Sequence, residues 1–174
     1  MSTITIPADY PWVMLSACAL PFLTNFALGG SVMGARKKYD VKYPNLYAVP
    51  GVHKHADEFN RVQRGHQSMM ETMPNVIVMT LTAGLKFPKI AAGCCAAYCV
   101  GNYFYQSGYA DITKDVKGAR YTKPLAVLKP LGIVGTFALS VTTCVLLLTA
   151  SAVVEPIEAA VAEPAFNAAP SPSE

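Results

Sequence analysis

The sequence predicts an all-α protein built as a four-transmembrane-helix bundle. Of its 174 residues, 52% are hydrophobic and only 14% are charged, and the mean hydropathy is +0.31. Soluble domains usually carry about 25% charged residues, so this composition indicates an integral membrane protein. Three long stretches lack Asp, Glu, Lys and Arg, and a fourth, shorter one follows a helix-forming segment. The formal net charge of +3 is too small to indicate nucleic-acid binding.

The first span is expected over about residues 10–34, before the basic residue Arg36. Its apolar stretch is longer than the core of a signal peptide, no basic residue precedes it, and Pro21 and Asn25 interrupt it. We therefore interpret it as a transmembrane helix and not as a cleaved leader. Lipid cannot satisfy free backbone groups, so each span must be helical.

The second span is expected over about residues 59–85. Its charge-free part after Glu71 is short for a hydrocarbon layer of about 30 Å, but the residues before Glu71 also suit a helix. Ionisable side chains would then occupy its first turns. The third and fourth spans are expected over about 89–110 and 124–153.

These spans divide the chain into a membrane domain, residues 1–153, and a tail, residues 154–174. The tail is rich in Ala, Pro and Glu, a composition that cannot bury a core. We expect a disordered extension or one that contacts a partner in a larger membrane complex.

Loop charges predict the orientation. All but two of the 14 Lys and Arg residues lie in or beside the first and third loops, and the two exceptions are Lys86 and Lys89. Under the positive-inside rule the first and third loops are cytosolic, and both termini lie on the opposite side.

The cysteines all fall within the apolar spans and are Cys18, Cys94, Cys95, Cys99 and Cys144. Their number is odd and they form no paired Cys-x-x-Cys units, so neither a disulfide framework nor a zinc site is indicated. We expect them to act as small residues at helix contacts, with no metal bound.

A polar stripe is the most informative feature of the second span. On a helical wheel one sector holds Asp57, Asn60, Arg61, Arg64, Gln67, Ser68 and Glu71. Arg64 and Glu71 are two turns apart, so each could compensate the charge of the other. Ionisable residues at membrane depth are costly and often functional. A structural ion pair with a snorkelling arginine is an equally good explanation on these residues alone.

The third span carries a second polar face, formed by Tyr98, Asn102, Tyr105 and Tyr109. An interfacial aromatic belt explains Tyr109 well. It explains Tyr98 poorly, because that phenol lies near the middle of the span and needs a polar partner. A ligand or the stripe of the second span could provide one.

Three segments resemble the MAPEG family of membrane proteins. They are Gly-Ala-Arg-Lys-Lys-Tyr-Asp-Val-Lys-Tyr-Pro at 34–44, Phe-Asn-Arg-Val-Gln-Arg-Gly-His-Gln-Ser-Met-Met-Glu at 59–71, and Tyr105-Gln-Ser-Gly-Tyr109. The resemblance extends from about Pro11 to Leu148, in matching order, and the motif in the second span is its most specific part. It implies a homotrimer of four-helix subunits that bind glutathione, as co-substrate, between adjacent subunits.

The resemblance also implies roles for individual residues. The implied glutathione contacts are Arg36, Arg64, His66, Ser68, Glu71, Tyr105 and Tyr109, with His66 reaching over from the neighbouring chain. Ser68 stands where relatives commonly have Asn. Relatives also place a thiolate-activating Arg after the second tyrosine, where this loop differs in length; Arg120 is the best match and Lys117 the second.

Arginines suit the two carboxylates of glutathione through forked, charge-assisted hydrogen bonds, and Glu71 suits its ammonium group. A fixed cation near the thiol favours the thiolate. The implied function is a glutathione transferase or peroxidase acting on hydrophobic electrophiles or lipid hydroperoxides. By resemblance its membrane is that of the endoplasmic reticulum, with a mitochondrial membrane as the alternative.

A second hypothesis is a non-catalytic structural or lipid-binding subunit of a larger membrane complex. We favour the enzyme, because charged residues at membrane depth are energetically costly and would not be expected without a function. A transporter is a distant third, since the chain lacks paired interrupted spans.

Overall fold

The structure, a computed structural model, describes residues 6–162 and contains helices but no strand in that part of the chain. Four long helices and two short ones follow one another: α1 (Tyr10–Tyr39), α2 (Ala56–Gly84), α3 (Pro88–Tyr109), α4 (Val116–Ala119), the 3₁₀ turn η1 (Pro124–Val127) and α5 (Leu128–Ala162). Residues 163–174 of the expected tail lie outside the described residues.

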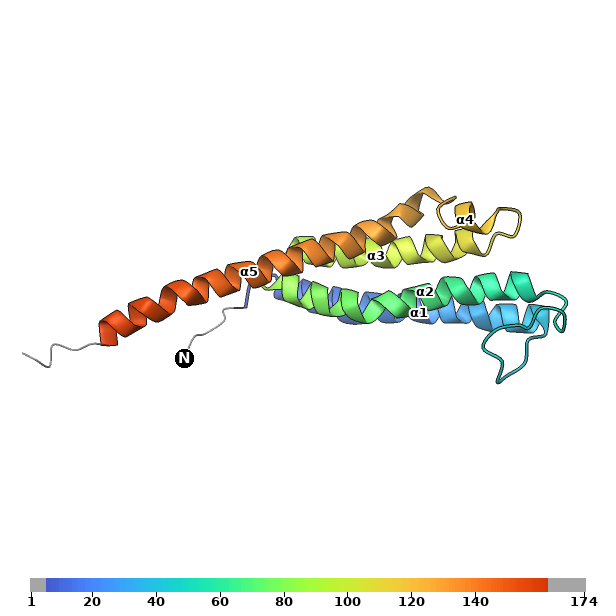
Figure 1. The fold of residues 1–174 in the computed structure, drawn as a ribbon, viewed down its shortest axis with the longest axis horizontal. Coiled ribbons are helices and arrows are strands. Elements are labelled where there is room, and N and C mark those ends of the chain that lie inside the picture. The colour runs from blue at the N-terminus through green and yellow to red at the C-terminus, as the bar shows by residue number, and fades with distance from the viewer. Residues whose placement is uncertain (1–5, 163–174) are drawn as a thin grey trace, which may run out of the picture.

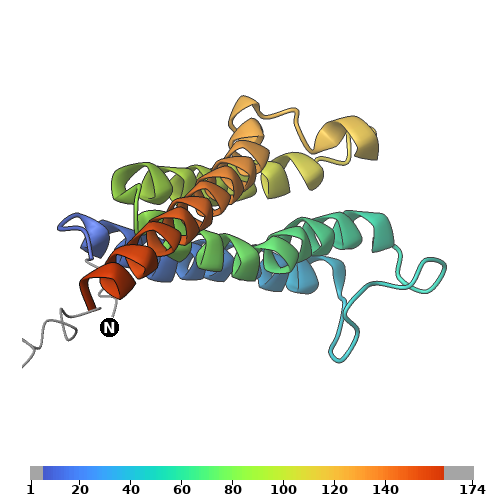
Figure 2. The same cartoon turned by 60° about the vertical axis from the view of Figure 1, so that its left-hand side comes forward.

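The four long helices lie side by side and alternate in direction (Figures 1 and 2). Helix α3 contacts α1, α2 and α5, and α2 also contacts α1 and α5. The connection between α1 and α2 and the connection that carries α4 therefore meet at one end of the structure, while the short turn between α2 and α3 lies at the other (Figure 1). All the expected site residues in these two connections are gathered at the same end.

Local sequence signals mark the helix ends. Proline occupies the first turn of α1, α3 and η1, where its fixed φ suits the helix and its missing N–H costs nothing. Asp40 ends α1 in the left-handed conformation, with φ of 51°. Helix α1 is longer than the expected span because Arg36, Lys37 and Lys38 continue its last turn.

Two helical segments are long and apolar enough to cross a membrane by length and composition: α1 and the segment Pro124–Ala150. Helices α2 and α3 carry polar faces, and crossing of the bilayer by these two stays a prediction. Several of their polar side chains, including Gln63, Asn102 and Gln106, are buried against neighbouring helices. Such burial is what a polar residue at membrane depth requires.

The last helix differs from the expected span 124–153. It is preceded by one 3₁₀ turn and continues to Ala162, into what the sequence indicated as a tail. Alanine and glutamate, which are common in that segment, are strong helix formers. The end of α5 projects past the other helices (Figures 1 and 2).

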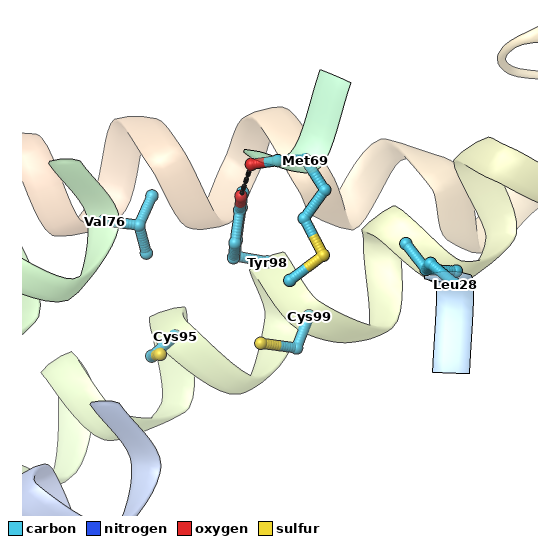
Figure 3. Close-up of a cluster of buried hydrophobic side chains, with 6 residues drawn as sticks. All are labelled: Leu28, Met69, Val76, Cys95, Tyr98 and Cys99. Atoms are coloured by element: carbon cyan, nitrogen blue, oxygen red, sulfur yellow. Dashed lines mark hydrogen bonds between the residues drawn. The ribbon is translucent and has the colours of Figure 1, made fainter. Parts of the chain in front are cut away.

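The central core brings α1, α2 and α3 together around Tyr98 (Figure 3). Its buried members are Leu28, Met69, Val76, Cys95, Tyr98 and Cys99. The Tyr98 hydroxyl donates to the carbonyl of Met69 at 2.9 Å and is 2.8 Å from the Thr72 hydroxyl. Residues of α2 therefore supply the polar partners that the Tyr98 hydroxyl needs in the middle of the span. Cys95 and Cys99 are free thiols at this helix contact, whereas Cys18 and Cys144 are exposed.

Candidate functional site

The ion pair suggested by the spacing of Arg64 and Glu71 is present in the structure. The Arg64 Nη1 atom lies 2.8 Å from Glu71 Oε1, and the two side chains are 42% and 48% exposed in the single chain. The stripe of α2 therefore presents a paired cation and anion at its surface, each still accessible to a zwitterionic ligand.

A buried cation lies beside this pair. Lys129 of α5 is only 6% exposed. Its Nζ donates to the Ser68 hydroxyl at 2.7 Å and to the Ser68 carbonyl at 3.4 Å, and lies 4.0 Å from the ring centroid of Tyr105. It is close enough to Arg64 and Glu71 for their charges to interact with its own. Ser68 and Tyr105, which are two of the expected glutathione contacts, thus both contact Lys129. The sequence analysis used Lys129 only as one of the basic residues of the third loop.

Close contact between α3 and α5 brings Lys129 to this place. A Cβ added to Gly101 of α3 would lie 2.0 Å from the backbone nitrogen of Lys129, and one added to Gly132 of α5 would lie 2.6 Å from the backbone of Tyr98. Both positions need glycine, because the two backbones touch there. The first turn of α5 therefore lies directly on α3, and its lysine extends across to α2.

The two expected tyrosines of α3 form an aromatic group at the same place. The rings of Tyr105 and Tyr109 stack with centroids 6.0 Å apart, and Tyr121 meets Tyr105 edge-on at 5.7 Å. An open cleft of about 360 Å³ has Tyr109, Arg64, Tyr47 and Asn60 among its lining residues.

An apolar groove of about 470 Å³ lies between α2 and α5. Its lining residues are Thr72, Asn75, Val76, Val78, Met79, Ile133 and Phe137. Thr72 and Ile133 lie one helical turn beyond Ser68 and Lys129, on the same helix faces. The apolar groove therefore begins one helical turn beyond the contact between Lys129 and Ser68.

Arg61 belongs to the polar stripe in the sequence, but in the structure it contacts the connection after α3. It is buried, and its Nη1 donates to the carbonyls of Asp111 and Lys114 at 3.0 Å each, while its Nε meets Asp57 at 3.1 Å. It thereby ties the connection after α3 to α2. The Asp111 carboxylate accepts from the Thr113 hydroxyl and N–H, and these bonds lower the pKa of Asp111.

The two expected thiol-activating cations differ in surroundings. Lys117 is exposed on α4. Arg120 follows α4 directly and is half-buried, and its Nε has no hydrogen-bond partner within the described part of the chain. The adjacent Tyr121 contacts Tyr105. Arg120 is therefore the sequence neighbour of a residue in the tyrosine group.

Arg36 and His66 are engaged elsewhere in the single chain. Arg36 donates to the carbonyls of Asn45 at 2.8 Å and Val41 at 3.4 Å. His66 Nε2 lies 2.8 Å from Asn25 Oδ1. The structure thus places Arg36 against the first loop and His66 against α1, rather than among the side chains around Lys129.

Sequence reasoning missed three residues of this site: Lys129, Tyr121 and Tyr47, whose hydroxyl donates to Gln67. For Lys129 a signal was available, since it is the last charge before the long apolar stretch of the fourth span. Nothing local marks the two tyrosines. Within the described residues, no group of three or more His, Cys, Asp or Glu side chains lies together as metal ligands.

Comparison with known proteins identifies relatives over most of the chain. Residues 14–153 match the sequence model of the MAPEG family. The chain is 34% identical over 125 residues to "Microsomal glutathione S-transferase 2" of Homo sapiens and, equally, of Bos taurus, covering 70% of this chain and 77% of each relative. The motifs quoted above look most like microsomal glutathione transferase 3, whereas both these relatives carry the name of type 2. The match supports the family and not that finer assignment. The chain belongs to the MAPEG family.

Proposed function

We propose that this protein is a membrane-bound glutathione transferase that conjugates glutathione to hydrophobic electrophiles, with a capacity to reduce lipid hydroperoxides. The observation that carries the proposal is the Arg64–Glu71 ion pair at 2.8 Å beside the buried Lys129 and the tyrosines of α3. The names of its relatives, both glutathione S-transferases, support the same chemistry.

Glutathione carries two carboxylates and one ammonium group, and the α2 face offers a partner for each kind of charge. Arg64 would bind a carboxylate through a charge-assisted fork. Glu71 would receive the ammonium, and the hydroxyls of Tyr105 and Tyr109 would donate to remaining oxygens. When glutathione binds, Arg64 and Glu71 would give up their contact with each other, and each would pair with a charged group of the ligand. Neither side chain is then left with an uncompensated charge.

Catalysis then requires the thiolate, because the thiolate and not the thiol is the nucleophile. A cation from the segment between α3 and α5 would stabilise it; on sequence Arg120 is the first candidate and Lys117 the second. In transfer, the sulfur forms a bond to the electrophilic carbon as the leaving group departs. In the peroxidase reaction two thiols become a disulfide while the hydroperoxide becomes an alcohol and water. Hydrophobic substrates would arrive through the apolar groove between α2 and α5.

We further propose that the protein acts as a homotrimer in the endoplasmic reticulum membrane, with a mitochondrial membrane as the alternative. A neighbouring subunit would explain why His66 lies away from Lys129 in one chain, since it would serve the site of an adjacent copy. Many large apolar side chains are exposed in the single chain, among them Phe22, Phe26 and Phe137. Such surfaces suit lipid or another subunit.

Titration of the purified, detergent-solubilised protein with glutathione, followed by turnover with a lipid hydroperoxide and with an aromatic electrophile, tests the proposal. We expect saturable binding and turnover with both substrate classes. Absence of glutathione binding would instead favour a structural or lipid-binding subunit.

A further inference from the structure

The connection between α1 and α2 is anchored to the polar stripe of α2 by one asparagine. The Ala48 N–H donates to Asn60 Oδ1 at 2.8 Å, and Asn60 Nδ2 donates to the Ala48 carbonyl at 2.9 Å. A side-chain amide offers both a donor and an acceptor, so Asn60 satisfies both backbone groups of this residue. Ala48 is also buried in a cluster with Val41 and Phe59. The loop is therefore held on α2 at this point.

Tyr47, the residue before this anchor, lies in the polar cleft near Arg64. Its side chain is half-buried, its hydroxyl donates to Gln67 of α2, and it is close enough to Arg64 to interact with the guanidinium charge. Tyr47, Arg64 and Tyr109 all line the same cleft of about 360 Å³. The anchor at Ala48 therefore places a phenol of the loop beside the proposed glutathione-binding face of α2.

The charges that line this cleft suit an anion. They are two arginines and one carboxylate, that of Asp57, which is already paired with Arg61 at 3.1 Å. Within the described residues Arg64 donates to Glu71 through Nη1. A guanidinium has five N–H donors, so others can serve a ligand in the cleft. Two tyrosine hydroxyls add further donors, and a carboxylate that enters the cleft would meet donors from the loop, α2 and α3.

We propose that Tyr47 is a glutathione-binding residue supplied by the first loop, and that its hydroxyl donates to the ligand carboxylate bound by Arg64. The inference rests on the proposed function and adds to it a contact from outside the long helices. On binding, the hydroxyl exchanges the amide oxygen of Gln67 for a carboxylate oxygen. A hydrogen bond to a charged group is roughly twice as strong as one between neutral groups, so the exchange favours the ligand. Gln67 is half-buried, and its released oxygen can accept from water.

Asn60 is the positioning residue for this contact. Both of its bonds to Ala48 are made to the loop backbone, so they persist while Tyr47 turns from Gln67 to the ligand. A loop that is already held in place does not have to be ordered when the ligand binds, and such preorganisation increases affinity.

Tyr47→Phe in the full-length protein removes the hydroxyl and keeps the ring. Tyr43→Phe is the matched control, because Tyr43 lies in the same loop, is 74% exposed, and keeps the ring that contacts Arg36. Isothermal titration measures the affinity for glutathione, and turnover of an aromatic electrophile gives kcat and the KM for glutathione separately. Thermal unfolding shows whether each variant is folded.

We expect Tyr47→Phe to weaken glutathione binding by about three- to tenfold, because one hydrogen bond to a charged group is lost and one to Gln67 no longer competes. The KM for glutathione should rise by the same factor and kcat should change little. Tyr43→Phe should match the unmodified protein. Asn60→Leu should weaken binding as Tyr47→Phe does and should also speed hydrogen exchange at the Ala48 amide.

Arg64→Ala distinguishes a shared carboxylate from two independent contacts. If Tyr47 and Arg64 bind the same carboxylate, Tyr47→Phe should change the affinity by less than about twofold in the Arg64→Ala background. An equal loss in both backgrounds would show that the two residues bind separate groups and would overturn the shared contact.

Unchanged affinity in Tyr47→Phe would overturn the inference as a whole and leave the proposed function intact. Failure of the unmodified protein to bind glutathione would overturn both. If Asn60→Leu does not fold, Tyr47→Phe decides the question alone, because that substitution leaves the anchor between Asn60 and Ala48 in place.

Discussion

Gly101 of α3 lies against the backbone of Lys129 in α5, so closely that an added Cβ would come within 2.0 Å of the Lys129 nitrogen. This contact holds the first turn of α5 on the bundle. It also sets the point from which the lysine reaches Ser68 on α2, 61 residues away in sequence. The candidate site therefore depends on a contact between two backbones that carries no chemistry of its own.

Gly101→Ala should destabilise the protein, because a methyl group there must push α5 away from α3. Overfilled contacts of this kind typically cost about 1–3 kcal/mol. Thermal unfolding in detergent measures the effect. Gly93→Ala is the control in the same helix, since nothing lies within 4 Å of the added methyl group; it should leave stability unchanged or raise it by up to about 1 kcal/mol.

Arg64→Ala and Glu71→Gln should each weaken glutathione binding by about tenfold or more, since a hydrogen bond to a charged group contributes about 1.5–3 kcal/mol. Isothermal titration measures the affinity. Lys89→Ala breaks another exposed ion pair, with Asp9 at 3.2 Å, at the other end of the structure and should not change it. Unchanged glutathione affinity in both variants would show that Arg64 and Glu71 do not form the binding site.

Arg61→Met should loosen the connection after α3. The carbonyls of Asp111 and Lys114 would lose their donor, at a cost of about 1–3 kcal/mol. Amide hydrogen exchange over residues 111–119 should speed up, with little change in the middle of α3. Asp57→Asn removes only the partner that is 71% exposed and should exchange like the unmodified protein. Equal exchange in Arg61→Met would show that other contacts hold this connection.

Ending the chain after Ala152 should leave glutathione turnover intact. Lys129 is the second residue of α5, and the removed segment lies at the far end of that helix. Turnover per mole of folded protein measures the effect. Loss of activity without loss of folding would mean that the end of α5 takes part in assembly of the site, and loss of a co-purifying complex would favour the structural alternative.

Part of the site could be predicted because it lies on one helix. Arg64 and Glu71 pair as their spacing of two turns suggests, since a helix fixes which of its own residues face each other. Helix spacing alone does not give the partners of Arg61, which shares that sector but donates to carbonyls of a distant loop. The segment in which composition favoured a tail begins within α5, which continues to Ala162.

The sequence by itself determined the helical class, the approximate helix positions and the polar face of α2, because each depends on residues close together in the chain. Only the tertiary structure decided that Lys129 and Ser68 meet, that Tyr121 joins Tyr105, and that an apolar groove begins one turn beyond them. The physical reason is that these contacts depend on how closely α3 and α5 approach. That distance is set by glycines at positions 101 and 132, whose effect appears only when the two helices are placed together.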